Sequence, residues 1–200
     1  MKHIFKQGAS DKPTLLLLHG TGGNEEDLVQ LAHLIAPDNS FLSVRGNVSE
    51  NGMPRFFKRH AEGVFDEEDL VARTHELNQF ITDASEKYDF DRDNVIAIGY
   101  SNGANIAGSL LLHDENALKA AILHHPMVPI RGLKTPDLSN MPIFIGAGEN
   151  DPICSSEETI ELEKILSDAG ASVTVHWERM GHQLTKPEVD AAAQWYNQKF

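Results

Sequence analysis

The sequence is poor in cysteine and in long apolar runs. Cys154 is the one cysteine among 200 residues, so no disulfide can form within the chain. The first residues lack the apolar core of about 7–15 residues that a secretory signal requires. The longest apolar run, residues 15–18, is far shorter than the roughly 20 residues that span a bilayer. These absences exclude a disulfide scaffold and a membrane-spanning protein, and they favour a cytoplasmic location.

Positive charge is also scarce. The chain has 17 Lys and Arg residues against 30 Asp and Glu, a formal net charge of −13 at pH 7. Such a surface repels phosphate backbones and anionic lipid headgroups, so neither nucleic acid nor a membrane is an expected partner. With 40% hydrophobic residues and no abrupt shift in composition, we expect one globular domain over residues 1–200.

Strand patterns alternate with helix patterns along the chain. The predicted strands cover residues 14–18, 40–44, 94–98, 120–123, 142–145 and 172–177, and the predicted helices begin near Asn24, Asp66, Asn102, Ser155 and Pro187. This alternation predicts a mostly parallel sheet with helices on both faces. Residues 45–65 show no periodicity and are expected to form a long loop over a site.

The motif Gly-x-Ser-x-Gly at residues 99–103 places Ser101 between a predicted strand and a predicted helix. A nucleophile elbow has this strand–turn–helix context, in which the glycines avoid collisions around a strained serine. We therefore predict that Ser101 is a nucleophile. The alternative is a serine in an ordinary glycine turn.

A serine nucleophile needs a base and a carboxylate that orients the base. Among ten histidines, His182 lies in the loop after the last predicted strand, and Asp151 follows the strand at 142–145. The order Ser101, Asp151, His182 is that of α/β-hydrolases. The alternatives are a loop histidine, a turn-forming aspartate, and Glu149 as a rival acid.

The oxyanion of an acyl-transfer reaction needs two backbone N–H donors. One comes from the residue after the nucleophile and one from the loop after the first buried strand, which here are Asn102 and Thr21. The alternative for residues 19–23 is a simple strand-to-helix turn. A phosphate-binding loop is less favoured because the Walker lysine is missing.

These motifs together resemble a known family. Residues 17–23, 99–103 and 148–152, with Gly181 and His182, resemble the phospholipase/carboxylesterase family of α/β-hydrolases. Residues 54–59 and 63–66 resemble its small bacterial carboxylesterase branch, which includes hydrolases linked to hydroquinone and quinone stress. The resemblance implies an α/β-hydrolase fold, and the short chain leaves no room for a cap domain. The thioesterase branch usually has Gln after the nucleophile, where this chain has Asn102.

Three further residues are predicted to contact a substrate. Phe56 and Phe57 interrupt a polar stretch, and Met127 follows the strand at 120–123, so all three could line an apolar pocket. The alternative for the two phenylalanines is a core of the loop itself. His124 and His125 lack a third ligand with metal spacing, so no metal or cofactor is expected.

The sequence thus predicts a serine carboxylesterase that hydrolyses small or short-chain esters through an acyl-enzyme. An acyl-thioesterase or lysophospholipase would use the same residues, and a ligand-binding module on a hydrolase scaffold is the alternative outside catalysis. A small-molecule ester is the expected partner, and the sequence leaves open whether the protein forms a homodimer.

Overall fold

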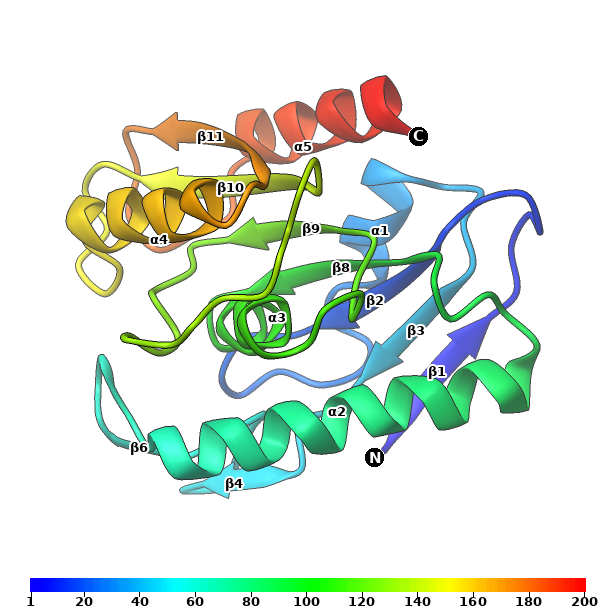
Figure 1. Ribbon diagram of the computed structural model, residues 1–200, viewed down its shortest axis with the longest axis horizontal. Helices are drawn as coiled ribbons and strands as arrows, with labels where there is room; N and C mark the ends of the chain where they lie inside the picture. The colour runs from blue at the N-terminus through cyan, green and yellow to red at the C-terminus, as the bar shows by residue number, and fades with distance from the viewer.

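The computed structural model describes residues 1–200 and is built on a seven-stranded sheet in the order β1-β3-β2-β8-β9-β10-β11 (Figure 1). The strands are β1 (His3–Lys6), β2 (Thr14–Leu18), β3 (Phe41–Val44), β8 (Val95–Tyr100), β9 (Ala120–His124), β10 (Pro142–Gly148) and β11 (Ser172–Glu178). All neighbours are parallel except β1, which pairs with β3 antiparallel. The prediction of a mostly parallel sheet is confirmed.

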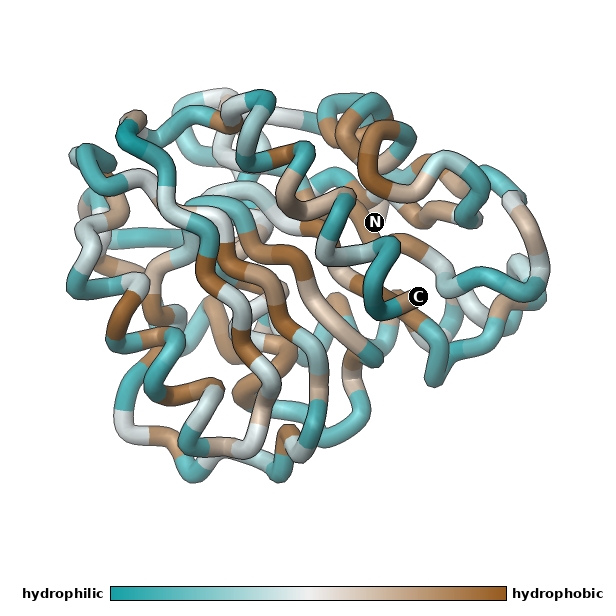
Figure 2. Tube along the Cα trace, turned by 90° about the horizontal axis from the view of Figure 1, so that it is seen from above, coloured by the Kyte–Doolittle hydropathy of each residue, from teal (hydrophilic) through white to brown (hydrophobic).

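Helices cover both faces of the sheet. One face packs against α2 (Glu67–Tyr88), α3 (Asn102–His113) and α4 (Ser156–Asp168), and the other packs against α1 (Val29–Ile35) and α5 (Lys186–Lys199). Side chains alternate along β2: Leu16 and Leu18 join the first core, while Leu15 and Leu17 join the second. Burial on both faces explains why this strand is apolar without interruption. Figure 2 shows apolar strands in the interior and polar segments around them.

Two N-terminal features differ from the expectation. Strand β1 was not predicted, because its four residues lie at the sheet edge, mostly half-buried, and show no alternation. The first helix begins at Val29 rather than after Asn24. The Asn24 side chain instead accepts a hydrogen bond from the N–H of Glu26, 2.8 Å away, and so forms a turn.

Residues 45–65 are not the structureless stretch that we expected. They form two small hairpins, β4 (Val48–Glu50) with β5 (Met53–Arg55), and β6 (Arg59–Ala61) with β7 (Val64–Phe65). Strands of two or three residues are too short to show a period of two in the sequence.

Most predicted helix starts are confirmed. Asp66 accepts a hydrogen bond from the N–H of Asp69 at 3.0 Å at the start of α2. At the C-terminal end of α4, Gly170 has a φ of +97°, which suits a glycine after a helix. Ser155 precedes α4, but its side chain makes no capping hydrogen bond. None of the helices combines the length and the apolar character needed to cross a bilayer.

The turn around Ser101 is held by close backbone packing. A Cβ atom on Gly99 would lie 2.6 Å from the carbonyl oxygen of Gly103, and one on Gly103 would lie 1.9 Å from the carbonyl oxygen of Leu18. Both distances are far below van der Waals contact. The start of α3 therefore lies directly against the end of β2, and only glycine permits this approach.

We expect Gly103→Ala to lower the free energy of unfolding by roughly 3 kcal/mol, because the new methyl group displaces the backbone of β2. Gly108→Ala in the same helix is the matched control. There the Cβ would meet only the ring of Pro129, with Cγ at 3.1 Å and Cδ at 3.8 Å, and the gain in helix propensity offsets the small adjustment. Chemical denaturation of both variants measures the difference. Equal stabilities would contradict the close approach at Gly103.

Candidate active site

Ser101 lies between β8 and α3 in an unusual backbone conformation. Its φ is +52° and its ψ is −112°, a combination that a non-glycine residue adopts only when the surroundings impose it. Its N–H donates to the carbonyl of His124 at 2.9 Å, and its own carbonyl accepts from the N–H of Asn105 at 2.9 Å. The neighbouring strand and helix thus hold the strained residue.

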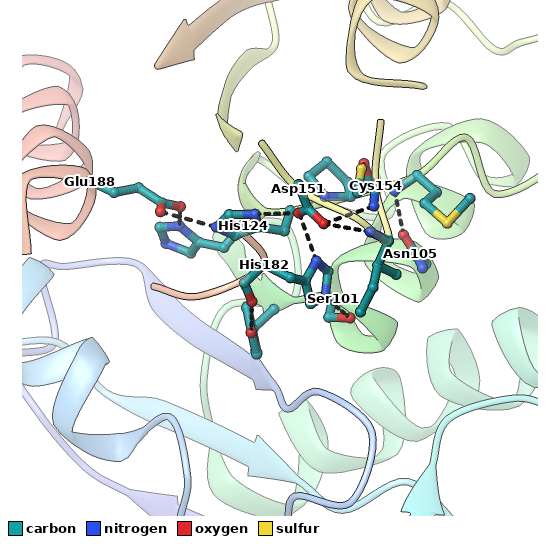
Figure 3. A network of polar contacts seen from close by, with 12 residues as sticks. Ser101, Asn105, His124, Asp151, Cys154, His182 and Glu188 are labelled. Atoms are coloured by element: carbon teal, nitrogen blue, oxygen red, sulfur yellow. Dashed lines mark hydrogen bonds and ion pairs between the residues drawn. The ribbon is translucent and has the colours of Figure 1, made fainter. Parts of the chain in front are cut away.

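Ser101, His182 and Asp151 form one hydrogen-bonded chain (Figure 3). Ser101 Oγ lies 2.7 Å from His182 Nε2, and His182 Nδ1 lies 2.7 Å from Asp151 Oδ2. A carboxylate accepts, so Nδ1 carries the proton and Nε2 is free to accept from the serine hydroxyl. The structure therefore brings together the three residues that the sequence singled out, from loops after three different strands.

The Asp151 carboxylate is buried and accepts four hydrogen bonds. Oδ1 accepts from the N–H groups of Ile153 and Cys154 at 2.8 and 2.9 Å, and Oδ2 accepts from His182 and, at 2.9 Å, from His125 Nδ1. Burial by itself would raise the pKa of Asp151. The backbone N–H groups and the two imidazoles outweigh burial and hold this pKa below its usual value.

The rival acid lies apart from this chain. The Glu149 side chain is 53% exposed, and its carboxylate is 3.9 Å from the guanidinium of Arg179. It makes no hydrogen bond to His182, whose Nδ1 is occupied by Asp151.

Two backbone N–H groups near Ser101 lack partners within the protein. In the loop after β2, Gly22 donates to the carbonyl of Pro54 at 2.9 Å and Gly23 to that of Gly20 at 3.1 Å, whereas the N–H of Thr21 makes no hydrogen bond. Asn102 is the first residue of α3, where helical N–H groups have no intrahelical acceptor. Both are the donors predicted for an oxyanion.

The segment 54–57 ties these two donor residues to each other. Arg55 Nη1 donates to Thr21 Oγ1 at 2.5 Å, and the N–H of Phe56 donates to Asn102 Oδ1 at 2.8 Å. Arg55 also donates through Nε to the carbonyl of Phe57 at 3.1 Å. One short segment therefore holds both the loop after β2 and the start of α3.

The prediction that Phe56 and Phe57 contact a substrate is wrong. Both rings are 0% exposed and belong to the core under α2 and α3. Phe56 packs on His19 and Phe57 packs edge-on against Phe65, with ring centres 4.8 and 5.1 Å apart. The rings join the main core of the domain, so the alternative of a separate core for the loop is not what the structure shows either.

A cleft beside Ser101 is lined by other side chains. They include Thr21, Arg55, Arg59, Phe65, Met127 and Ile153. Met127 thus lies where the sequence placed it, and its contact with a substrate stays a prediction.

Comparison with known proteins agrees with this geometry. Residues 58–199 match the dienelactone hydrolase family. The chain belongs to this family. It is 60% identical, over 99% of its length and 98% of the relative's, to MhqD of Bacillus subtilis (strain 168), which is named as a hydrolase. The resemblance to small bacterial α/β-hydrolases of the carboxylesterase type is therefore confirmed.

Solved structures show the same similarity. A Bacillus cereus carboxylesterase superposes with a TM-score of 0.99 at 62% identity, over 100% of this chain and 95% of the other. YahD, solved with malic acid, gives a TM-score of 0.96 at 36% identity, over 100% of this chain and 99% of the other. The α/β-hydrolase fold without a cap domain is confirmed.

Several residues of the site were missed by sequence reasoning. The Tyr100 hydroxyl donates to the carbonyl of His182, and Asn105 Oδ1 accepts from the N–H of Met127 at 2.8 Å. His125 and Glu188 form a buried network with Asp151. The adjacent histidines at 124 and 125 were the one available signal, since Glu188 looks like an ordinary first-turn acid of a helix.

Three of these side chains could also present ligand atoms to a metal. The ligand atoms of His125, Asp151 and His182 lie within 4.8 Å of one another. The Nδ1–H groups of both imidazoles, however, donate hydrogen bonds to Asp151 Oδ2, and a metal ion would have to replace those protons. The geometry favours a hydrogen-bonded chain, and the expectation of no metal stays a prediction.

We expect opposite effects from changing a buried ring and a cleft residue. Phe57→Leu should lower the free energy of unfolding by about 1–2 kcal/mol while leaving the ratio of kcat/KM for aryl and alkyl esters unchanged. Met127→Ala should change that ratio about fivefold or more with little effect on stability, because Met127 lines the cleft. Thermal melts and initial rates measure both. A changed ratio in Phe57→Leu would indicate that the ring contacts the substrate after all.

Proposed function

We propose that the protein is a serine carboxylesterase that hydrolyses small or short-chain carboxylic esters. The chain Ser101–His182–Asp151, with both of its links at 2.7 Å, is the observation that carries this proposal. The free N–H of Thr21 and the start of α3 supply the second requirement, which is a place for negative charge on the carbonyl oxygen.

The first half-reaction forms an acyl-enzyme. His182 Nε2 takes the hydroxyl proton of Ser101 as Oγ attacks the ester carbonyl carbon. The N–H groups of Thr21 and Asn102 stabilise the oxyanion, and Asp151 stabilises the imidazolium. His182 then gives its proton to the departing alcohol as the carbon–oxygen bond breaks. The second half-reaction repeats these steps with water, which releases the acid and restores Ser101.

Exposed apolar side chains in the cleft and close to its lining residues in the chain support an apolar substrate group. Ile153 lines the cleft and is 37% exposed. Val64, which is 52% exposed, follows the cleft residue Gly63 in the chain. Met180, which is 42% exposed, lies two residues before the cleft residue His182. Met53 at 40% lies against Gly22, with its Sδ 3.7 Å from where a Cβ of that glycine would be. Such surface is suited to a short alkyl or aryl group.

Two arginines favour a second class of ester. Arg55 and Arg59 both line the cleft, and guanidinium groups pair well with carboxylates. Arg59 already forms a two-point contact with Glu50, through hydrogen bonds of 3.0 and 2.9 Å. Since the related YahD was solved with malic acid, esters that carry a carboxylate are the second candidate.

A matched panel separates the candidates. It contains aryl, short alkyl, long-chain and carboxylate-bearing esters and one thioester, because thioesterase and lysophospholipase activity would use the same residues. A ligand-binding module would instead form a stable complex without turnover of any of them.

We expect Ser101→Ala and His182→Ala each to lower kcat by about a thousandfold or more, and the double variant to be little worse, because the two residues act as a unit. Initial rates on the best ester of the panel measure the loss, and thermal melts verify folding. Losses that multiply in the double variant would contradict a shared proton-transfer step.

The acid is tested by a neighbouring pair of substitutions. Asp151→Asn should be nearly as damaging as His182→Ala, because an amide that donates to Nδ1 imposes the wrong imidazole tautomer. Glu149→Gln, two residues away and 53% exposed in its side chain, is the control and should keep near-normal rates. The reverse order of damage would make Glu149 the acid.

A further inference from the structure

A buried chain of ionisable side chains continues beyond Asp151, away from Ser101 (Figure 3). Asp151 Oδ2 accepts from His125 Nδ1 at 2.9 Å, and His125 Nε2 lies 3.2 Å from Glu188 Oε2. His124 Nδ1 donates to the other oxygen of Glu188. The side chains of His125, Glu188 and His124 are at most 1% exposed. No step of the proposed reaction uses these three residues.

The geometry determines how many protons His125 carries. Each of its ring nitrogens faces a carboxylate oxygen, and an ionised carboxylate can only accept a hydrogen bond. Both nitrogens must therefore carry a proton, which makes the ring an imidazolium. His124 differs, because its Nε2 makes no hydrogen bond and one proton on Nδ1 satisfies Glu188.

The electrostatics of the two carboxylates agree with a cation between them. Burial alone would raise the pKa of Glu188, but hydrogen bonds from His124 and His125 outweigh it and lower this pKa to about 2. Burial likewise opposes a charge on His125, and Glu188 and Asp151 outweigh it and raise its pKa. Two buried carboxylates without this cation would be strongly destabilised.

The backbone is shaped to make room for this arrangement. His125 has a positive φ of +53°, and its N–H donates to the carbonyl of Gly146 on β10 at 2.7 Å. A Cβ on Gly146 would lie 2.0 Å from Glu188 Oε1, so only glycine at this position admits the carboxylate. A strained residue just after β9 and a glycine within β10 thus both make room for Glu188 beside His124 and His125.

We propose that His125 is a positioning residue, held as a cation by Asp151 and Glu188, that keeps His182 in its neutral, proton-accepting form at lower pH. This inference rests on the proposed function, in which His182 is the base. The ring centres of His125 and His182 are 5.3 Å apart, and both rings donate to Asp151 Oδ2. A positive charge on His125 therefore opposes a second positive charge on His182.

Other groups around the two rings leave this argument unchanged. The Tyr100 ring lies 6.0 Å from His125 and 5.6 Å from His182, and burial, with Asp151 and Glu188 adding to it, raises the pKa of this phenol, which stays neutral. Burial raises the pKa of Cys154 to about 12, and its thiol donates to the carbonyl of Pro126.

His125 and His182 both line the cleft, and the other ionisable residues there are Arg55 and Arg59, with Glu50 paired to Arg59 through two hydrogen bonds. The guanidinium groups of the two arginines bond to Thr21, Phe57 and Glu50, and neither forms a hydrogen bond with His125. Substitutions at His125 leave all of them in place.

The test is the pH profile of kcat/KM for His125→Gln. Without the cation His182 takes up a proton more readily, so the acid limb of the profile should move upward by about one pH unit, while the rate on the alkaline plateau stays within a few-fold. His124→Gln is the control: it touches Glu188 but not Asp151, and its acid limb should not move. A loss of rate at all pH values without a shift would indicate only a structural role.

Nuclear magnetic resonance of the unmodified protein tests the charge directly and needs no variant to fold. The ring nitrogens of His125 should both be protonated at pH 7.5, whereas an ordinary histidine has largely lost its proton there. A singly protonated His125 overturns the proposal. If instead Ser101→Ala retains full ester turnover, the proposed function fails, and the nitrogen signals still report on the imidazolium independently.

Discussion

The Asp151 carboxylate is the group on which the site depends. It is 1% exposed in its side chain and accepts four N–H hydrogen bonds, two from the backbone of its own turn and two from imidazoles. The backbone pair fixes the turn after β10, and the imidazole pair fixes His182 and His125. A neutral or displaced side chain here would weaken both the hydrogen bond that orients His182 and the hydrogen bond that stabilises the charge of His125.

A second constraint brings the two proposed oxyanion donors together. Gly103 lets the start of α3 approach the end of β2, so that Asn102 and Thr21 come near each other. The segment 54–57 then ties both of them through Arg55 and Phe56, and it is itself held by two fully buried rings. The hairpin region of residues 45–65 therefore acts on the site by holding its backbone, and its Arg55, Arg59 and Phe65 also form part of the cleft wall.

The fold and the grouping of three polar residues beside one another were predictable because their signals are local. Apolar runs mark strands buried on both faces, and Ser101, Asp151 and His182 each follow a strand at the edge where parallel strands end. The role of Phe56 and Phe57 was not predictable, because an aromatic pair in a polar stretch fits a pocket wall and a local core equally well. Glu188 carried no signal at all, since only its tertiary contact with His125 and Gly146 distinguishes it from a surface acid.

The most direct test of the serine mechanism is a crystal structure of the protein after reaction with a small alkyl fluorophosphonate, whose adduct resembles the tetrahedral intermediate. We expect phosphorus bound covalently to Ser101 Oγ and its phosphoryl oxygen within hydrogen-bond distance of the backbone nitrogens of Thr21 and Asn102. An adduct on another residue, or a phosphoryl oxygen directed away from both nitrogens, would contradict the proposed nucleophile or its oxyanion site.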